Sequence, residues 1–138
     1  MSLIGGVGCE RTEPVQPQAQ VQKTVSPALR DFWAICLWEG RGVINENAIN
    51  VYENARGAAQ ITPIYLEDAN FWLKSHHMKT YTHAEMHDSH KAFLVCQAYW
   101  RRYGLTTTEA RARAHASGPD GPYQDNSLAY WAGVQSYL

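Results

Sequence analysis

Apolar residues recur at the spacing of an α-helix from Ser26 onward. Four of them occupy positions i, i+3, i+4 and i+7, the pattern of a helix with one face in a core: Leu29, Phe32, Trp33 and Cys36. Ser26 followed by Pro27 has the form of an N-cap with proline at the first helical position. The pattern therefore predicts a helix over Pro27–Glu39 that ends at Gly40.

Four further helices are predicted, three of them from a start signal. Thr62-Pro63 repeats the combination of cap and proline, and Thr82 and Thr106 each begin a capping box with a glutamate three residues later. Glycines or glycine–proline pairs end two of these segments. The predicted helices cover residues 63–74, 82–103, 106–115 and 127–138. The last of them is expected to carry its apolar residues on one side: Leu128, Trp131 and Val134.

The remaining segments are of two kinds. Residues 1–25 are rich in glutamine and proline and lack aromatic side chains, a composition that cannot bury a core. Residues 41–57 are rich in asparagine and glycine and predict a loop, with a short extended segment at residues 48–52. We therefore predict a mainly α fold. A flexible tail, residues 1–25, precedes one helical domain, residues 26–138, which contains a short irregular or β-like loop region.

Composition excludes several classes of protein. The chain has 138 residues, of which 45% are hydrophobic and 18% charged, so that one globular domain is expected and a disordered or coiled-coil protein is not. Its net charge of −1 gives no basic footprint for nucleic acid. The longest apolar run, Phe32–Trp38, is too short to span a membrane.

The three cysteines form no recognisable disulfide framework. Cys36 and Cys96 lie in apolar, helix-like segments, which favours two buried thiols over a bridge between them. Cys9 follows a short apolar stretch and is a candidate for a lipid anchor. No positively charged segment precedes it, and the stretch is short for a signal peptide.

Glu39 is the residue best placed for chemistry. It stands at the end of the first predicted helix, next to Trp38 and one turn after Cys36. Partial burial disfavours the charged form of a carboxyl and favours the protonated form that a general acid requires. The alternative is an ordinary exposed glutamate in the last turn of a helix.

The order of motifs around Glu39 resembles the lysozyme-like superfamily of bacterial and phage muramidases and lytic transglycosylases. Four features carry the resemblance: Glu39 at the end of a helix, Gly42 shortly after it, the segment Gly57-x-x-Gln60-Ile61, and the turn His115-x-x-Gly118-Pro119-x-Gly121. It covers about residues 29–138. It implies a lysozyme-like helical fold in which Glu39 is the general acid.

The resemblance also implies a substrate, the β-1,4 bond between N-acetylmuramic acid and N-acetylglucosamine in peptidoglycan. The partner would be the glycan strands of the bacterial cell wall, which a periplasmic, secreted or phage-delivered protein would reach. No cofactor or metal is expected.

Hydrolysis requires a second carboxylate or another stabiliser, for which Glu53 is the preferred candidate beside Glu46 and Asp68. In the alternative reaction, the sugar's own hydroxyl closes onto the anomeric carbon and yields an anhydro product. This reaction requires no second carboxylate. Acidic residues in the loop favour hydrolysis slightly.

One departure from the family pattern supports an alternative function. The turn has Ala116 where the family usually has an asparagine that helps to hold the substrate's N-acetyl group. The residues after the acid, Gly40-Arg41, also differ from the commoner Ser-Gly. The alternative is therefore a non-catalytic lysozyme-fold protein that binds the cell wall or has a structural role in a virion or envelope.

Aromatic and amide side chains provide candidates for sugar binding. Tyrosine rings stack on sugars or donate to their hydroxyls, and about two of four tyrosines are expected in the cleft: Tyr52, Tyr65, Tyr123 and Tyr130. Tyr52, Tyr65 and Tyr130 are the preferred ones. Gln60 either contacts the substrate or ties its loop to a neighbouring element. His115 in the turn completes the predicted binding set.

Three histidines offer a competing metal-site hypothesis. His83, His87 and His90 fall on one face of the predicted helix over residues 82–103. The first and third are two turns apart, about 10.5 Å along the axis, too far for one tetrahedral zinc ion. A solvated helix face is the preferred interpretation.

Overall fold

The computed structural model describes residues 25–138, and within them the fold is mainly α, as predicted. The tail predicted over residues 1–25 and the lipid-anchor candidate Cys9 lie outside the described residues, except for Val25. Within residues 25–138, five α-helices, three short 3₁₀ helices and two short strands follow one another in this order: α2 (Pro27–Glu39), β2 (Ile49–Asn50), β3 (Ala55–Arg56), α3 (Pro63–Ser75), η1 (Ala84–His87), α4 (Ser89–Arg102), α5 (Thr108–Ser117), η2 (Gly121–Tyr123), η3 (Asp125–Ser127) and α6 (Leu128–Gln135).

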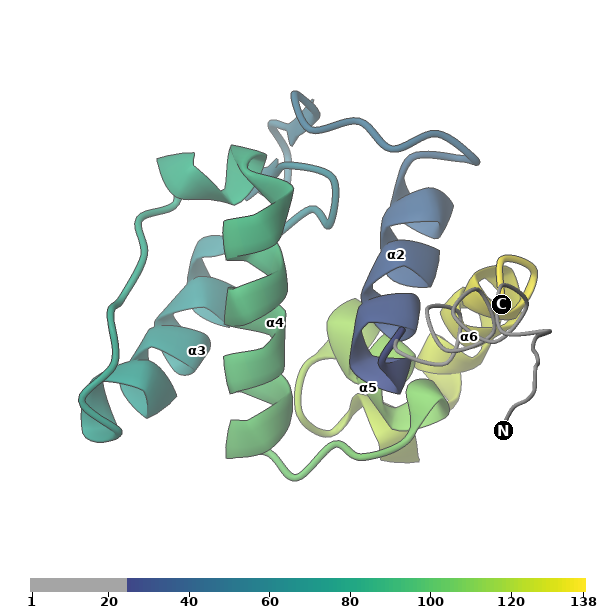
Figure 1. Cartoon of the computed structure of the whole chain (residues 1–138). Coiled ribbons are helices and arrows are strands. Elements are labelled where there is room, and N and C mark those ends of the chain that lie inside the picture. Colours follow the sequence, from purple (N-terminus) through teal and green to yellow (C-terminus); the bar gives the residue numbers. More distant parts are fainter. Residues whose placement is uncertain (1–24) are drawn as a thin grey trace, which may run out of the picture.

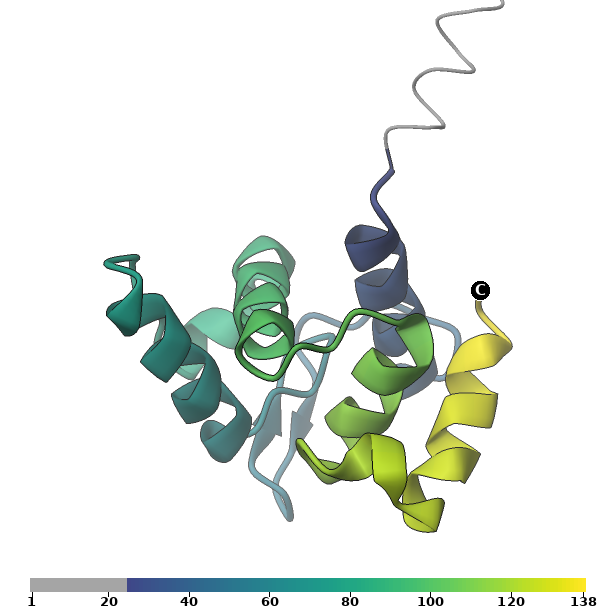
Figure 2. The ribbon, with the colours of Figure 1, turned by 90° about the horizontal axis from the view of Figure 1, so that it is seen from below.

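The helices form two groups (Figures 1 and 2). Helices α3 and α4 pack together on one side, and α2, α5 and α6 pack together on the other. Helix α2 also contacts α4, so that the two groups share a core at this point. The β2–β3 hairpin follows α2 and leads into α3. The last turn of α2 and the first turn of α3 therefore lie at the ends of one connecting segment.

The sequence signals of α2 act as expected. The Ser26 hydroxyl accepts a hydrogen bond from the Leu29 amide at 3.1 Å, and the helix ends at Glu39 as predicted. Phe32 and Cys36 are fully buried. Trp33 is a correction to the predicted core face, because its ring packs edge-on against Phe32 and is 37% exposed.

The predicted helix over residues 82–103 is two elements. Thr82 and Glu85 do form a capping box, with the Thr82 amide donating to Glu85 Oε1 at 2.9 Å, but it opens only the 3₁₀ turn η1. Asp88 then leaves the helical conformation and caps α4 itself, accepting from the Lys91 amide at 3.1 Å. The Glu46 carboxylate accepts from the Ser89 amide in the same turn.

Two smaller boundaries also differ from the prediction. The N-cap of α5 is Thr107 and not Thr106, since the Thr107 hydroxyl accepts from the Ala110 amide at 3.1 Å. Helix α6 ends at Gln135. Within α6, Val134 is buried as predicted, but Leu128 is 45% exposed and lies outside the core.

The core contains both cysteines of the described part of the chain. Cys36 and Cys96 are free and fully buried, consistent with the prediction of two buried thiols. Burial raises the pKa of the Cys96 thiol to about 12 and raises that of Cys36 as well. Both thiols therefore stay protonated at neutral pH. Among residues 25–138, no helix has the length and apolar character needed to cross a membrane.

Candidate active site

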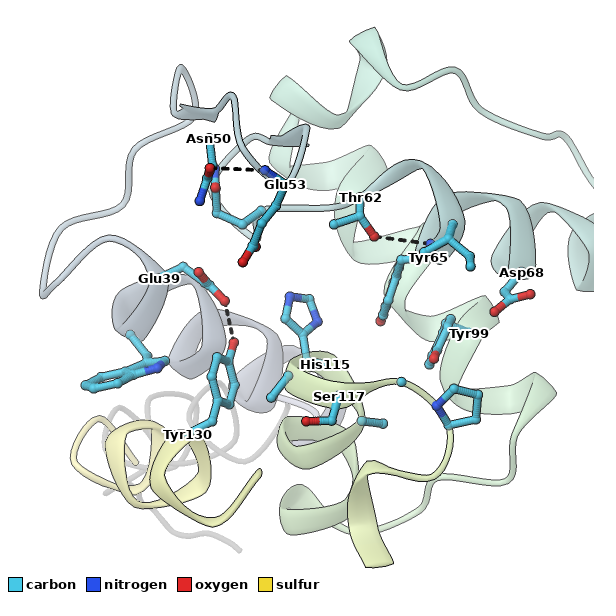
Figure 3. A pocket seen from close by; sticks show the side chains of 17 residues that line it. Glu39, Asn50, Glu53, Thr62, Tyr65, Asp68, Tyr99, His115, Ser117 and Tyr130 are labelled. Atoms are coloured by element: carbon cyan, nitrogen blue, oxygen red, sulfur yellow. Dashed lines mark hydrogen bonds between the residues drawn. The ribbon is translucent and has the colours of Figure 1, made fainter. Parts of the chain in front are cut away.

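A cleft of about 790 Å³ separates the two helix groups (Figure 3). It is bounded by the end of α2, the hairpin, the first turns of α3, the end of α5 with the turn that follows, and α6. Seventeen residues line it: Trp38, Glu39, Asn50, Glu53, Gln60, Thr62, Ile64, Tyr65, Asp68, Tyr99, Ala114, His115, Ala116, Ser117, Gly118, Pro119 and Tyr130. The cleft thus brings together six predicted site residues: Glu39, Glu53, Gln60, Tyr65, His115 and Tyr130.

A short hydrogen bond joins Glu39 and Tyr130 in the cleft. The Tyr130 hydroxyl donates to Glu39 Oε2 at 2.6 Å, joining the last turn of α2 to α6 (Figure 3). Burial and the negative charge of Glu39 raise the pKa of Tyr130 well above its ordinary value. The tyrosine therefore remains a neutral donor at any working pH. It holds a half-buried carboxyl that lines the cleft.

His115 is anchored to the loop before α3. Its Nε2 lies 2.6 Å from the carbonyl oxygen of Ala59, and because a carbonyl only accepts, Nε2 is the donor. The second ring nitrogen, Nδ1, is buried without a partner among the described residues. The Tyr65 hydroxyl next to it is also buried and unpartnered. Tyr65 itself is stacked on Tyr99 at a centroid distance of 3.9 Å.

The three candidates for the second carboxylate have different surroundings. Glu53 lies on the hairpin turn and lines the cleft, and its side chain points into the same space as that of Glu39 (Figure 3). Asp68 also lines the cleft, but it pairs with Arg102 at 3.3 Å. Glu46 does not line it and instead accepts a hydrogen bond from the Ser89 amide in the first turn of α4. Glu53 is the candidate with access to a substrate and no ion pair among the described residues.

Gln60 ties the loop together and still lines the cleft. Its Nε2 donates to the carbonyl oxygens of Gly57 at 3.0 Å and Ala48 at 3.3 Å. These bonds fix the path of the chain between the hairpin and α3. Of the two predicted roles of Gln60, the structure shows one, tying its loop together. Because Gln60 also lines the cleft, it is placed where it can contact a substrate as well.

Tyr52 is not in the cleft. Its backbone amide and that of Glu53 both donate to the Asn50 side chain, which tightens the hairpin turn. This geometry turns Glu53 inward and leaves the Tyr52 side chain 97% exposed. The structure therefore does not support Tyr52 as a member of the cleft. Tyr123 is likewise exposed, so that Tyr65 and Tyr130 are the two tyrosines of the four that line the cleft.

Trp38 is a cleft residue that sequence reasoning did not assign to substrate. The sequence indicates only that Trp38 is a neighbour of Glu39 that can partly bury its carboxyl group. Its side chain lines the cleft and is 37% exposed. The available signal was its position, because an aromatic residue next to a candidate acid at a helix end must share the acid's surroundings.

The predicted histidine face is dispersed by the break between η1 and α4. His83 Nε2 bonds to the Ile61 carbonyl oxygen and His87 Nδ1 to that of Glu46, both at 2.7 Å. His90 is exposed on α4. Across residues 25–138, no group of three or more metal-binding side chains is present. Two of the three histidines instead attach the loop region to the rest of the domain.

The chain was compared with family models, with curated proteins and with solved structures, and no match was found in any of the three comparisons.

Proposed function

We propose that this protein is a glycosidase that cleaves the β-1,4 bond between N-acetylmuramic acid and N-acetylglucosamine in peptidoglycan, with Glu39 as general acid. The observation that carries the proposal is the hydrogen bond from Tyr130 to Glu39 inside the cleft. A carboxyl held by a neutral donor at the wall of a large, open, partly aromatic cleft has the placement that proton delivery to a bound glycan requires.

The lining supports a sugar polymer as substrate. Aromatic rings alternate with hydroxyl, amide and carboxyl groups along the cleft, and its described lining contains no lysine or arginine. Sugars offer both apolar ring faces and many hydroxyls, so they match such a mixed surface. An anionic substrate such as a phosphate ester would find no cation among these residues.

The proposed chemistry begins at the glycosidic oxygen. Glu39 protonates this oxygen as the bond to the anomeric carbon breaks and positive charge develops on the sugar ring. Glu53, on the facing hairpin, stabilises this charge or activates a water molecule. Tyr130 keeps the Glu39 carboxyl in place and contributes no proton of its own, because its pKa is raised far above neutrality.

Clearing of a purified cell-wall suspension tests the proposal. Glu39→Gln keeps the shape of the side chain and an oxygen that accepts from Tyr130, but it cannot deliver a proton. We expect clearing to fall by about 10²–10⁴-fold, the usual cost of losing a general acid, with folding retained by circular dichroism. Glu67→Gln is the matched control, since Glu67 is exposed on α3 and does not line the cleft.

Mass spectrometry of the released fragments identifies the reaction. A reducing-end sugar indicates hydrolysis, which the position of Glu53 favours, and a 1,6-anhydro sugar indicates transglycosylation. Wild-type clearing by Glu39→Gln would refute the assignment of this residue. Complete inactivity of the wild-type protein would instead favour the non-catalytic, wall-binding or structural function, which Ala116 at the cleft wall supports.

A further inference from the structure

Trp38 is packed against the backbone of α6. A Cβ built at Gly133 would lie 2.5 Å from each of three atoms of the indole six-membered ring, Cδ2, Cε2 and Cζ2. A point equally close to three neighbouring ring atoms lies above the ring and not at its edge. The helix backbone at Gly133 therefore covers one face of the indole, and only glycine leaves room for it there.

The Tyr130 ring makes a second contact with Trp38. The Tyr130 ring meets Trp38 edge-on, with a centroid distance of 6.3 Å and an interplanar angle of 88°. Tyr130 and Gly133 are three residues apart, on the same side of α6. The same short segment thus holds Trp38 and, through the Tyr130 hydroxyl, Glu39.

Trp38 keeps part of its surface exposed and contributes to the lining of the cleft. The side chain is 37% exposed although one face is covered by α6 and a ring edge meets it from the side. A large, rigid aromatic surface that stays exposed next to a functional group loses little conformational entropy when a ligand covers it. β-Linked glucose-type sugars have equatorial hydroxyls, so their ring faces are apolar and pack on such a surface.

We infer that Trp38 is the stacking platform for a sugar ring next to the bond that Glu39 protonates, and that Gly133 is the residue that sets the position of this platform. Tyr130 contacts both groups, with its hydroxyl 2.6 Å from Glu39 Oε2 and its ring centroid 6.3 Å from that of Trp38. Trp38 and Glu39 therefore lie side by side in the lining of the cleft, and a sugar ring stacked on Trp38 lies near the bond that Glu39 protonates. The inference rests on the proposed function for the role of Glu39. Sugar binding by Trp38, however, is measurable without any cleavage.

The experiment measures binding of the β-1,4-linked tetramer of N-acetylglucosamine by titration calorimetry and tryptophan fluorescence, with Glu39→Gln as the background so that no turnover occurs. We expect Trp38→Ala to raise Kd at least about tenfold, as for an aromatic residue at the centre of a binding site. The fluorescence change on binding should disappear with Trp38→Phe. Trp33→Ala is the matched control, because Trp33 lies on the same helix, is equally exposed and does not line the cleft.

Gly133→Ala provides a second variant that moves the ring without removing it. We expect weaker tetramer binding with the helical circular dichroism spectrum retained. In the active protein it should raise KM more than it lowers kcat. Equal Kd values for the Trp38→Ala and Trp33→Ala proteins, or no tetramer binding by any variant, would overturn the inference. Trp38-dependent binding by a wild-type protein that clears no cell wall would uphold sugar stacking on Trp38 and reject the glycosidase proposal, and with it the placement of the sugar at a bond that Glu39 cleaves.

Discussion

The Tyr130 hydroxyl holds the carboxyl group of Glu39 in its position at the cleft. Tyr130→Phe removes the 2.6 Å hydrogen bond but keeps the ring against Trp38. A carboxyl released from its donor samples other rotamers, so that we expect kcat on cell-wall substrate to fall about tenfold with KM nearly unchanged. The free energy of unfolding should fall by about 0.5–1.5 kcal/mol, the usual net contribution of one hydrogen bond.

Steady-state kinetics and urea unfolding check both numbers. Tyr123→Phe serves as the control, because Tyr123 is exposed and outside the cleft. If Tyr130→Phe lowers the stability but leaves kcat unchanged, the role of Tyr130 is structural only. A rise in KM at constant kcat would assign it to substrate binding instead of positioning of the acid.

The candidate acid could be found from local sequence, but its partner could not. Glu39 follows a predictable helix and a tryptophan, so a partly buried position was foreseeable. Tyr130 is 91 residues away, and a tyrosine within an apolar helix looks the same whether its hydroxyl meets water or a carboxylate. The exclusion of Tyr52 was equally hidden, because the Asn50 turn that points it outward depends on backbone geometry.

Among the elements, the β2–β3 hairpin depends on one glycine. Gly57 has a φ of +83°, and a Cβ at this position would collide with the carbonyl oxygen of Met86 in η1. Gly57→Ala must therefore displace either the hairpin or η1. We expect a loss of about 3 kcal/mol or more in unfolding free energy and a fall in activity, because the hairpin carries Glu53.

Thermal unfolding and cell-wall clearing measure these effects. Gly104→Ala isolates the cost of the backbone conformation alone, since Gly104 also has a positive φ of +64° but no atom within 4 Å of the added Cβ. About 1 kcal/mol is expected there. Equal losses for the two variants would show that close packing against Met86 contributes nothing.

The start of a helix could be predicted from the sequence where a single capping side chain determines it. Ser26 and Thr62 cap their helices as the sequence indicates, each accepting from the amide three residues on. Thr106 and Thr107 are chemically identical, so the side chains alone do not determine that Thr107 is the cap. The break at Asp88 is set by tertiary bonds from His83 and His87 to other segments. No local pattern contains that information.

At the scale of the whole molecule, the buried acids of the core set an upper pH limit. Burial raises the pKa values of Cys36, Cys96, Tyr65, Tyr99 and Tyr130 above their ordinary values. In the unfolded chain these groups ionise from about pH 8.5 for cysteine and about pH 10 for tyrosine. Above these values the unfolded state has released protons that the folded state keeps, so stability falls as pH rises.

We therefore expect a melting temperature that these groups leave unchanged between pH 6 and 8 and that declines steadily above about pH 9. Differential scanning calorimetry across this range measures the decline. A Cys36→Ala/Cys96→Ala double variant lacks the groups that ionise first, so its decline should begin about one pH unit higher. A flat profile up to pH 11 would contradict the burial of these groups.

The link between α2 and α6 also has a consequence for biosynthesis. Glu39 is translated 91 residues before Tyr130, the tyrosine that binds it. Trp38 is likewise translated before Gly133, the residue on whose backbone it packs. A nascent chain that has folded only as far as α5 carries an acid without its donor and a tryptophan without its support. The Tyr130–Glu39 hydrogen bond and the packing of Trp38 on Gly133 therefore exist only in a chain in which α6 has been made and has docked on α2.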